Sequence, residues 1–154
     1  MRQPSTTPVP NVILDIYLKE LNSAELKVLL IVIRQTLGWA DRRGMFGRKE
    51  TDWISGSQLR QKTGSSKRAI TTAIDLLVRK KIIEILDEWG NVLKYPEERQ
   101  GKTKLFYRLN QYVYNSVDNT TDNFPTSAKF AEDISKKVTE LVQKMHITKE
   151  TIQN

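Results

Sequence analysis

The tetrapeptide Thr63-Gly64-Ser65-Ser66 separates two helical patterns, and this arrangement constrains the fold more than any other feature of the chain. A short segment before it, residues 57–63, carries Leu59. After it, apolar residues recur at the spacing of a helix that lies on a core, at positions 70, 73, 74, 77 and 78. Glycine permits a tight turn, and either Ser65 or Ser66 can cap the second helix. The pattern predicts a helix-turn-helix.

A second strong helix signal lies upstream of this pair. Asn22 and Glu25 have the spacing of a capping box, in which each side chain accepts a hydrogen bond from the other residue's backbone N–H. Apolar residues then repeat at helical spacing until Gly38, at positions 26, 29, 30, 33 and 37. A shorter helical pattern over residues 12–21 precedes them. The sequence therefore predicts two helices ahead of the helix-turn-helix.

Downstream of the pair, the apolar period changes from helical to alternating. Residues 82–89 and 104–109 are predicted strands, with a turn at Gly90-Asn91. Pro96 excludes a central strand from the polar stretch between them. A short extended piece is expected over residues 51–55. This order of elements predicts a mainly α (α+β) fold, a winged helix-turn-helix with a β-hairpin wing.

Four regions follow from the composition along the chain: a Pro-rich flexible arm (1–10), the winged-helix domain (11–110), a polar linker (111–126) and a carboxyl-terminal amphipathic helix with its tail (127–154). The apolar stripe of this appended helix consists of Phe130, Ile134, Val138, Leu141 and Met145. It either folds back on the domain or pairs with another chain, and we favour a homodimer or a replication-protein partner.

The basic residues are concentrated in the middle of the chain. Residues 41–110 hold sixteen basic and nine acidic side chains, whereas residues 1–40 hold four and three and residues 111–154 hold five and six. A local excess of this kind is typical of a surface that binds a polyanion such as nucleic acid. Net charge also favours solubility, which is the alternative explanation.

The outward face of the predicted second helix is the main candidate for DNA contact. Its amino end attracts phosphate, its basic residues can reach guanine edges, and threonine can contact a thymine methyl group. The candidates are Ser65, Ser66, Lys67, Arg68, Thr71, Thr72 and Arg79. A solvated face on a supporting helix is the alternative.

Two further basic groups are weaker candidates for phosphate contacts. One lies in the loop after the long amino-terminal helix and consists of Arg42, Arg43, Arg48 and Lys49, for which a solvated turn is an equally weighted alternative. The other lies on the wing and consists of Lys94, Arg99, Lys102 and Lys104. Glu97 and Glu98 share the wing and would repel a phosphate surface, so the helix is favoured over the wing.

Several segments resemble the amino-terminal domain of the phage replication protein O family. They are Val9-Pro10-Asn11, residues 21–30, the run from Ile33 to Trp39, residues 54–59, Thr63 to Ser66, and Ile82-Ile83. The resemblance covers residues 9–90. It implies a winged-helix domain that binds repeated sites in a replication origin, and a separate region that recruits the replicative helicase machinery. DNA binding carries over to residues 57–79.

The composition excludes most catalytic classes. The chain has no cysteine and one histidine, His146, so thiol chemistry, zinc sites and a Ser-His-Asp triad are not expected, and we predict no metal, no cofactor and no enzymatic activity. Without a long apolar run or a signal segment, we expect a cytoplasmic, nucleoid-associated protein. Three aromatic side chains are expected in the core: Trp53, Trp89 and Phe106.

The leading hypothesis is a sequence-specific double-stranded DNA-binding protein of a phage or mobile element that acts in replication initiation. Two alternatives stay open. One is a transcriptional regulator built on the same module, and the other is a winged-helix adaptor that binds protein through the carboxyl-terminal helix.

Overall fold

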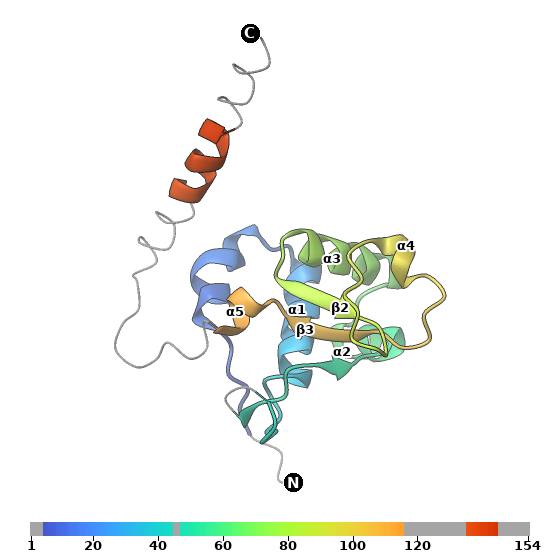
Figure 1. The fold of residues 1–154 in the computed structure, drawn as a ribbon. Helices are drawn as coiled ribbons and strands as arrows, with labels where there is room; N and C mark the ends of the chain where they lie inside the picture. Colours follow the sequence, from blue (N-terminus) through green and yellow to red (C-terminus); the bar gives the residue numbers. More distant parts are fainter. Residues whose placement is uncertain (1–4, 45–46, 116–134, 145–154) are drawn as a thin grey trace. The chain divides into compact units, whose positions relative to one another are not determined.

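The computed structural model describes residues 5–44, 47–115 and 135–144. The chain divides into two compact units, Met1–Asp118 and Asn119–Asn154. In the described part of the first unit, helices pack on one small antiparallel sheet (Figure 1). The α+β winged-helix class expected from the sequence is therefore confirmed.

Helix α1 (Ser23–Gln35) is the central element of the core. It begins at the predicted capping box: Glu25 N–H donates to Asn22 Oδ1 at 2.9 Å, and Asn22 N–H donates to Glu25 Oε2 at 2.8 Å. Its buried stripe consists of Val28, Leu29, Val32 and Ile33. Gly38 ends the following turn, where an added Cβ would collide with the Arg34 carbonyl oxygen.

The predicted short helix before α1 is present as two turns, a π-helical one over Ile13–Tyr17 and a 3-10 one over Leu18–Glu20. Its Ile13 side chain is fully buried. Pro10 is also buried and Val9 packs against the core, so the last residues of the expected flexible arm belong to the folded unit.

Helices α2 (Gly56–Thr63) and α3 (Lys67–Arg79) form the helix-turn-helix. Ser55 and Gln58 make a capping box at the start of α2. Gly64 follows with φ at +66°, in the left-handed region that favours glycine. Of the two serines considered as caps for α3, Ser66 holds the position, since its hydroxyl accepts from Ala69 N–H at 3.2 Å.

The three strands of the described sheet are β1 (Asp52–Trp53), β2 (Ile83–Leu86) and β3 (Phe106–Leu109), in the order β1-β3-β2 and all antiparallel. The predicted strand over 82–89 ends early because the Asp87 side chain closes a turn. Its carboxylate accepts from the Asn91 side-chain amide and from the backbone N–H groups of Trp89 and Asn91. These bonds, led by the one from the Asn91 side chain, lower the pKa of Asp87.

Two short helices lie where the sequence predicts none. Helix α4 (Pro96–Arg99) interrupts the wing, and α5 (Gln111–Asn115) occupies the start of the expected linker. Helix α5 is held on the domain by Val113, which is only 1% exposed and belongs to the hydrophobic core. Helix α4 begins with proline at its first position, where the missing N–H costs no hydrogen bond.

The expected core positions of the tryptophans are wrong. Trp89 is 77% exposed and Trp53 is 41% exposed, while Phe106 is half-buried. Trp89 lies in the Asp87 turn rather than on a strand, and Trp53 lies on an edge strand. The core is filled instead by aliphatic side chains and Tyr107.

Residues 135–144 form a helix in the second unit. Its Val138, Leu141 and Val142 side chains are exposed and share one face by their i, i+3, i+4 spacing. Three residues of the predicted stripe, Phe130, Ile134 and Met145, lie outside the described residues.

Candidate nucleic-acid interface

Helix α3 exposes a polar ridge opposite its buried stripe. Ile70, Ala73, Ile74 and Leu77 face the core, so Arg68, Thr72 and Arg79 project from the other side and are exposed. Within the described parts of the chain, the side chains of Lys67, Arg68 and Arg79 have no acidic partner. These cations are therefore available to an external anion.

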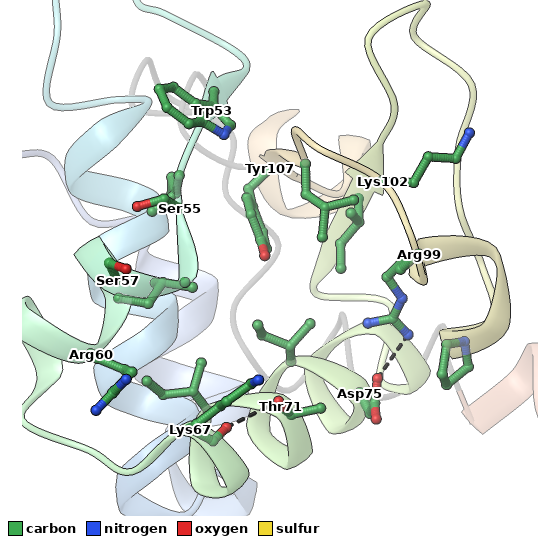
Figure 2. Close-up of a pocket in the computed structure, with 18 of the residues that line it drawn as sticks. Trp53, Ser55, Ser57, Arg60, Lys67, Thr71, Asp75, Arg99, Lys102 and Tyr107 are labelled. Atoms are coloured by element: carbon green, nitrogen blue, oxygen red, sulfur yellow. Dashed lines mark hydrogen bonds and ion pairs between the residues drawn. The ribbon is translucent and has the colours of Figure 1, made fainter.

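A groove of about 740 Å³ lies beside this ridge, between α2, α3, β1 and the wing (Figure 2). Lys67 and Thr71 line it from α3, and Ser55 and Ser57 line it from the amino end of α2. Trp53 stands at one side, and the Tyr107 hydroxyl points into the space. The predicted face of α3 is thus divided between an outer ridge and a groove wall.

The wing is joined to α3 by an ion pair. Arg99 Nη2 lies 2.8 Å from Asp75 Oδ1, with the two side chains only 10% and 24% exposed. The two side chains compensate each other's charge, but their geometry is not that of a hydrogen bond. The buried Asp75 Oδ1 therefore has no hydrogen-bond donor among the described residues. Arg99, predicted as a phosphate contact, is instead engaged within the protein.

The other wing cations differ in their surroundings. Lys102 Nζ lies 3.8 Å from Asp87 Oδ2 and 5.7 Å from the ring centre of Trp89. Lys104 Nζ lies 5.8 Å from the ring centre of Trp53. Lys94 is exposed, and the structure gives its side chain no acidic partner among the residues it describes. Trp89 in the wing and Trp53 on β1 therefore each have a lysine ammonium near the ring.

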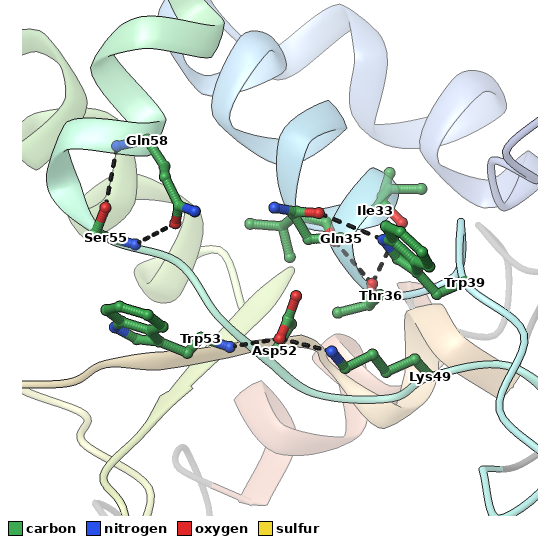
Figure 3. Close-up of polar contacts among 10 residues, drawn as sticks. Ile33, Gln35, Thr36, Trp39, Lys49, Asp52, Trp53, Ser55 and Gln58 are labelled. Atoms are coloured by element: carbon green, nitrogen blue, oxygen red, sulfur yellow. Dashed lines mark hydrogen bonds and ion pairs between the residues drawn. The ribbon is translucent and has the colours of Figure 1, made fainter. Parts of the chain in front are cut away.

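Two of the four cations in the basic loop after α1 are engaged within the protein, and Figure 3 shows one of them, Lys49 against Asp52. Lys49 Nζ lies 2.7 Å from Asp52 Oδ1, and Arg48 Nη1 donates to the Leu37 carbonyl at 3.4 Å. Arg43 Nε lies 3.9 Å from Asp41 Oδ1 at the surface. Arg42 is exposed. Of the four predicted loop contacts, Arg42 and Arg43 are the most accessible.

Arg34 and Trp39, which belong to the motif that carries the resemblance, have structural roles. Arg34 lies 5.3 Å from the centre of the Trp39 ring and donates to the Gly38 carbonyl at 3.2 Å. Trp39 Nε1 donates to Gln35 Oε1 at 3.4 Å (Figure 3). Together these contacts fix the chain as it leaves α1.

Three residues near α3 were missed by the reasoning from sequence. Arg60 and Lys62 are exposed cations on α2, and Arg60 lines the groove. Tyr107 is 3% exposed, and burial raises the pKa of its phenol to about 12 despite the nearby Arg99 charge. Arg60 could have been found from the sequence, because it lies on a predicted helix next to the turn. The burial of Tyr107 beside a groove depends on tertiary packing and could not.

Two classes of site are not found in the described residues. No group of three or more His, Asp or Glu side chains there could hold a metal ion. No helix in the same ranges is long and apolar enough to cross a bilayer.

No curated protein and no solved structure matches the chain. The bacteriophage replication protein O family, in contrast, matches residues 6–94, a range that runs from the segment before α1 through the helix-turn-helix to the start of the wing. This match spans more than half of the 154 residues. The chain therefore belongs to the bacteriophage replication protein O family.

Proposed function

We propose that this chain is a non-enzymatic, sequence-specific double-stranded DNA-binding protein that acts in phage replication initiation by binding the origin. The observation that carries the proposal is the exposed ridge of α3, on which Arg68, Thr72 and Arg79 project without an acidic partner in the described chain. A helix of this kind fits the major groove, where such side chains contact phosphates and base edges.

The amino end of α3 adds a second attraction for DNA. Ser66 caps the helix, and Lys67 and Arg68 follow in its first turn with no acidic residue beside them. The unpaired amides and the helix dipole favour a phosphate at this end. Ser65 precedes this cap, and Thr71 lies one turn further along α3, where its hydroxyl donates to the Lys67 carbonyl at 3.0 Å; both are proposed as further contacts. Arg42, Arg43, Lys94, Lys102 and Lys104 are proposed as secondary phosphate contacts at the edges.

A gel-shift series with fragments of the element's own genome tests this function. The wild-type chain is expected to retain an origin fragment with an affinity that falls steeply with salt. The double substitution Lys67→Ala with Arg68→Ala should weaken retention by more than tenfold. Lys27→Ala is the matched control, since Lys27 is an exposed lysine on α1 outside the proposed interface. Unchanged retention by the double variant would contradict the assignment of α3.

The same series separates origin binding from transcriptional regulation. Both functions use one physical interface, so only the identity of the bound fragment distinguishes them. Retention of repeated sites within an origin supports replication initiation, whereas retention of a promoter fragment supports a regulator.

We further propose that the helix over residues 135–144 binds a second copy of this chain or a replication protein. Its exposed Val138, Leu141 and Val142 form an apolar face of the kind that helices bury against one another. A Val138→Asp, Leu141→Asp variant should be monomeric if the wild type sedimented as a dimer. A wild type that sediments as a monomer and captures no replication protein would exclude this role.

A further inference from the structure

The groove between α3 and the wing has a chemistry that the outer ridge of α3 does not share. We propose that it binds one unpaired nucleotide, with the base inside the groove and the phosphate at its basic edge. Duplex binding would then use the outer ridge of α3 and this second activity the neighbouring groove, with Lys67 at the border between the two.

The interior of the groove suits a flat, largely apolar group. Its floor consists of Ile54, Leu59, Ile70, Ile74 and Leu105. Its volume of about 740 Å³ lies within the range of small-molecule sites in proteins. Trp53 is 41% exposed at the side of the groove and offers an aromatic surface on which a base can stack.

The Tyr107 hydroxyl faces the groove without a hydrogen-bond partner in the described chain. Tyr107 is 3% exposed, yet its hydroxyl points into the groove and makes no hydrogen bond with any residue that the structure describes (Figure 2). Among the described residues, Asp75 Oδ1 and not this hydroxyl is the fully buried polar atom without a partner, so the hydroxyl is accessible from the groove and can bond a ligand that has a hydrogen-bonding edge. Every nucleobase has such an edge, whereas an aliphatic side chain does not.

The charges around the groove favour an anion at its edge. Arg60 from α2 and Lys67 from α3 lie on the same side in Figure 2, and neither has an acidic partner in the described chain. Among the described residues that line the groove, Asp75 alone is acidic, and Arg99 compensates its charge. The amino end of α2, with Ser55 and Ser57, opens at the same edge.

A planar base joined to a phosphate satisfies all of these features at once. A base within a duplex does not, because its faces are stacked and its Watson–Crick edge is paired. The groove therefore selects an unpaired nucleotide, either free or within a single strand of DNA.

The test measures binding of the full chain to labelled oligothymidine of about 16 nucleotides by fluorescence anisotropy. Trp53→Ala is expected to weaken binding at least about fivefold, because one stacking surface is lost. Tyr107→Phe removes only the hydroxyl and should weaken binding about threefold. Trp89→Ala is the matched control, since Trp89 is exposed but does not line the groove, and it should leave the affinity unchanged.

Two competitors, compared with the unlabelled strand itself, define the ligand. An abasic phosphodiester of equal length should compete poorly, because it offers charge without a base. If thymidine monophosphate competes at the same nucleotide concentration as the strand, the free nucleotide is the ligand. If it competes much more weakly, single-stranded DNA is the ligand. The proposal is overturned if the abasic strand competes as well as unlabelled oligothymidine. It is also overturned if the Trp53→Ala and Tyr107→Phe variants bind oligothymidine as tightly as the wild type.

Duplex binding, measured in parallel, keeps this inference separate from the proposed function. Arg68→Ala with Arg79→Ala lies on the outer ridge and should reduce duplex binding far more than binding of oligothymidine, and Tyr107→Phe should do the reverse. A wild type that binds duplex but no oligothymidine refutes the groove site alone. A wild type that binds only oligothymidine refutes the duplex function alone.

Discussion

Asp75 on α3 and Arg99 on α4 are joined by an ion pair of 2.8 Å that connects the wing to the second helix of the helix-turn-helix. Arg99 is 10% exposed, and its Nε also donates to the Tyr95 carbonyl at 3.4 Å. The pair thereby forms one wall of the groove while leaving the outer ridge of α3 uncovered. Arg99 thus shapes the interface from within the protein.

Arg99→Ala should destabilise the fold by about 1–3 kcal/mol, because it leaves the half-buried Asp75 carboxylate, whose Oδ1 is fully buried, without charge compensation. Urea unfolding of the single and double variants measures this effect. Asp75→Ala with Arg99→Ala should be less destabilised than the sum of the two single changes. Additive losses would show that the two side chains do not interact.

A second ion pair joins the carboxyl end of α3 to the amino end of α1. Lys80 Nζ lies 2.7 Å from Glu25 Oε1 and donates to the Glu20 carbonyl at 2.8 Å. Glu25 is 1% exposed, so Lys80→Met leaves a buried carboxylate without its cation and should cost about 3 kcal/mol. The neighbouring exposed Lys81→Met is the control and should cost far less. Equal thermal midpoints for the two variants would contradict this role.

The helices were predictable because their signals are local. The Asn22–Glu25 capping box, the left-handed Gly64 and the apolar stripe of α3 each act within a few residues. Helix α4 was not predictable, because four residues alone do not make a stable helix. Its Glu98 side chain accepts from Tyr95 N–H at 3.0 Å, but its anchor is Arg99 on Asp75, a contact between residues distant in sequence.

The residues of the candidate site also fall into those set by local sequence and those set by tertiary contacts. The exposure of Lys67, Arg68, Thr72 and Arg79 follows from helical periodicity, and the structure has it as predicted. The partners of Arg99 and Lys49 depend on tertiary contacts, so the sequence could not separate these cations from free ones. Hydrophobicity likewise could not tell that Trp89 lies in a turn closed by Asp87.

Salt dependence should identify the cations that contact phosphate. Each phosphate that a cation neutralises contributes about 0.9 to the slope of log affinity against log salt concentration. The variant with Lys67→Ala and Arg68→Ala should therefore lose about 2 from the slope for duplex DNA. Lys49→Ala should change it little, because Lys49 is paired with Asp52. A loss for Lys49→Ala as large as that for one α3 cation would place the loop in the interface.

Tyr107 should make the fold sensitive to alkali. Burial raises the pKa of its phenol from 10.0 to about 12, so below pH 10 the phenol is protonated in both the folded and the unfolded chain. Between pH 10 and about 12 the unfolded chain loses this proton while the folded chain keeps it, and the free energy of unfolding falls. The loss from this group should approach about 3 kcal/mol.

Urea unfolding of Tyr107→Phe, the wild type and Tyr112→Phe across this alkaline range isolates the effect. Phenylalanine keeps the buried ring but has no proton to lose, so Tyr107→Phe should become the most stable of the three chains as the pH rises. Tyr112 is 79% exposed, and its removal should leave the wild-type pH dependence unchanged. Parallel stability curves for the wild type and Tyr107→Phe would mean that the phenol of Tyr107 titrates equally in both states. In that event it is hydrated in the folded protein, and the groove floor beneath Trp53 is wet rather than closed by the core.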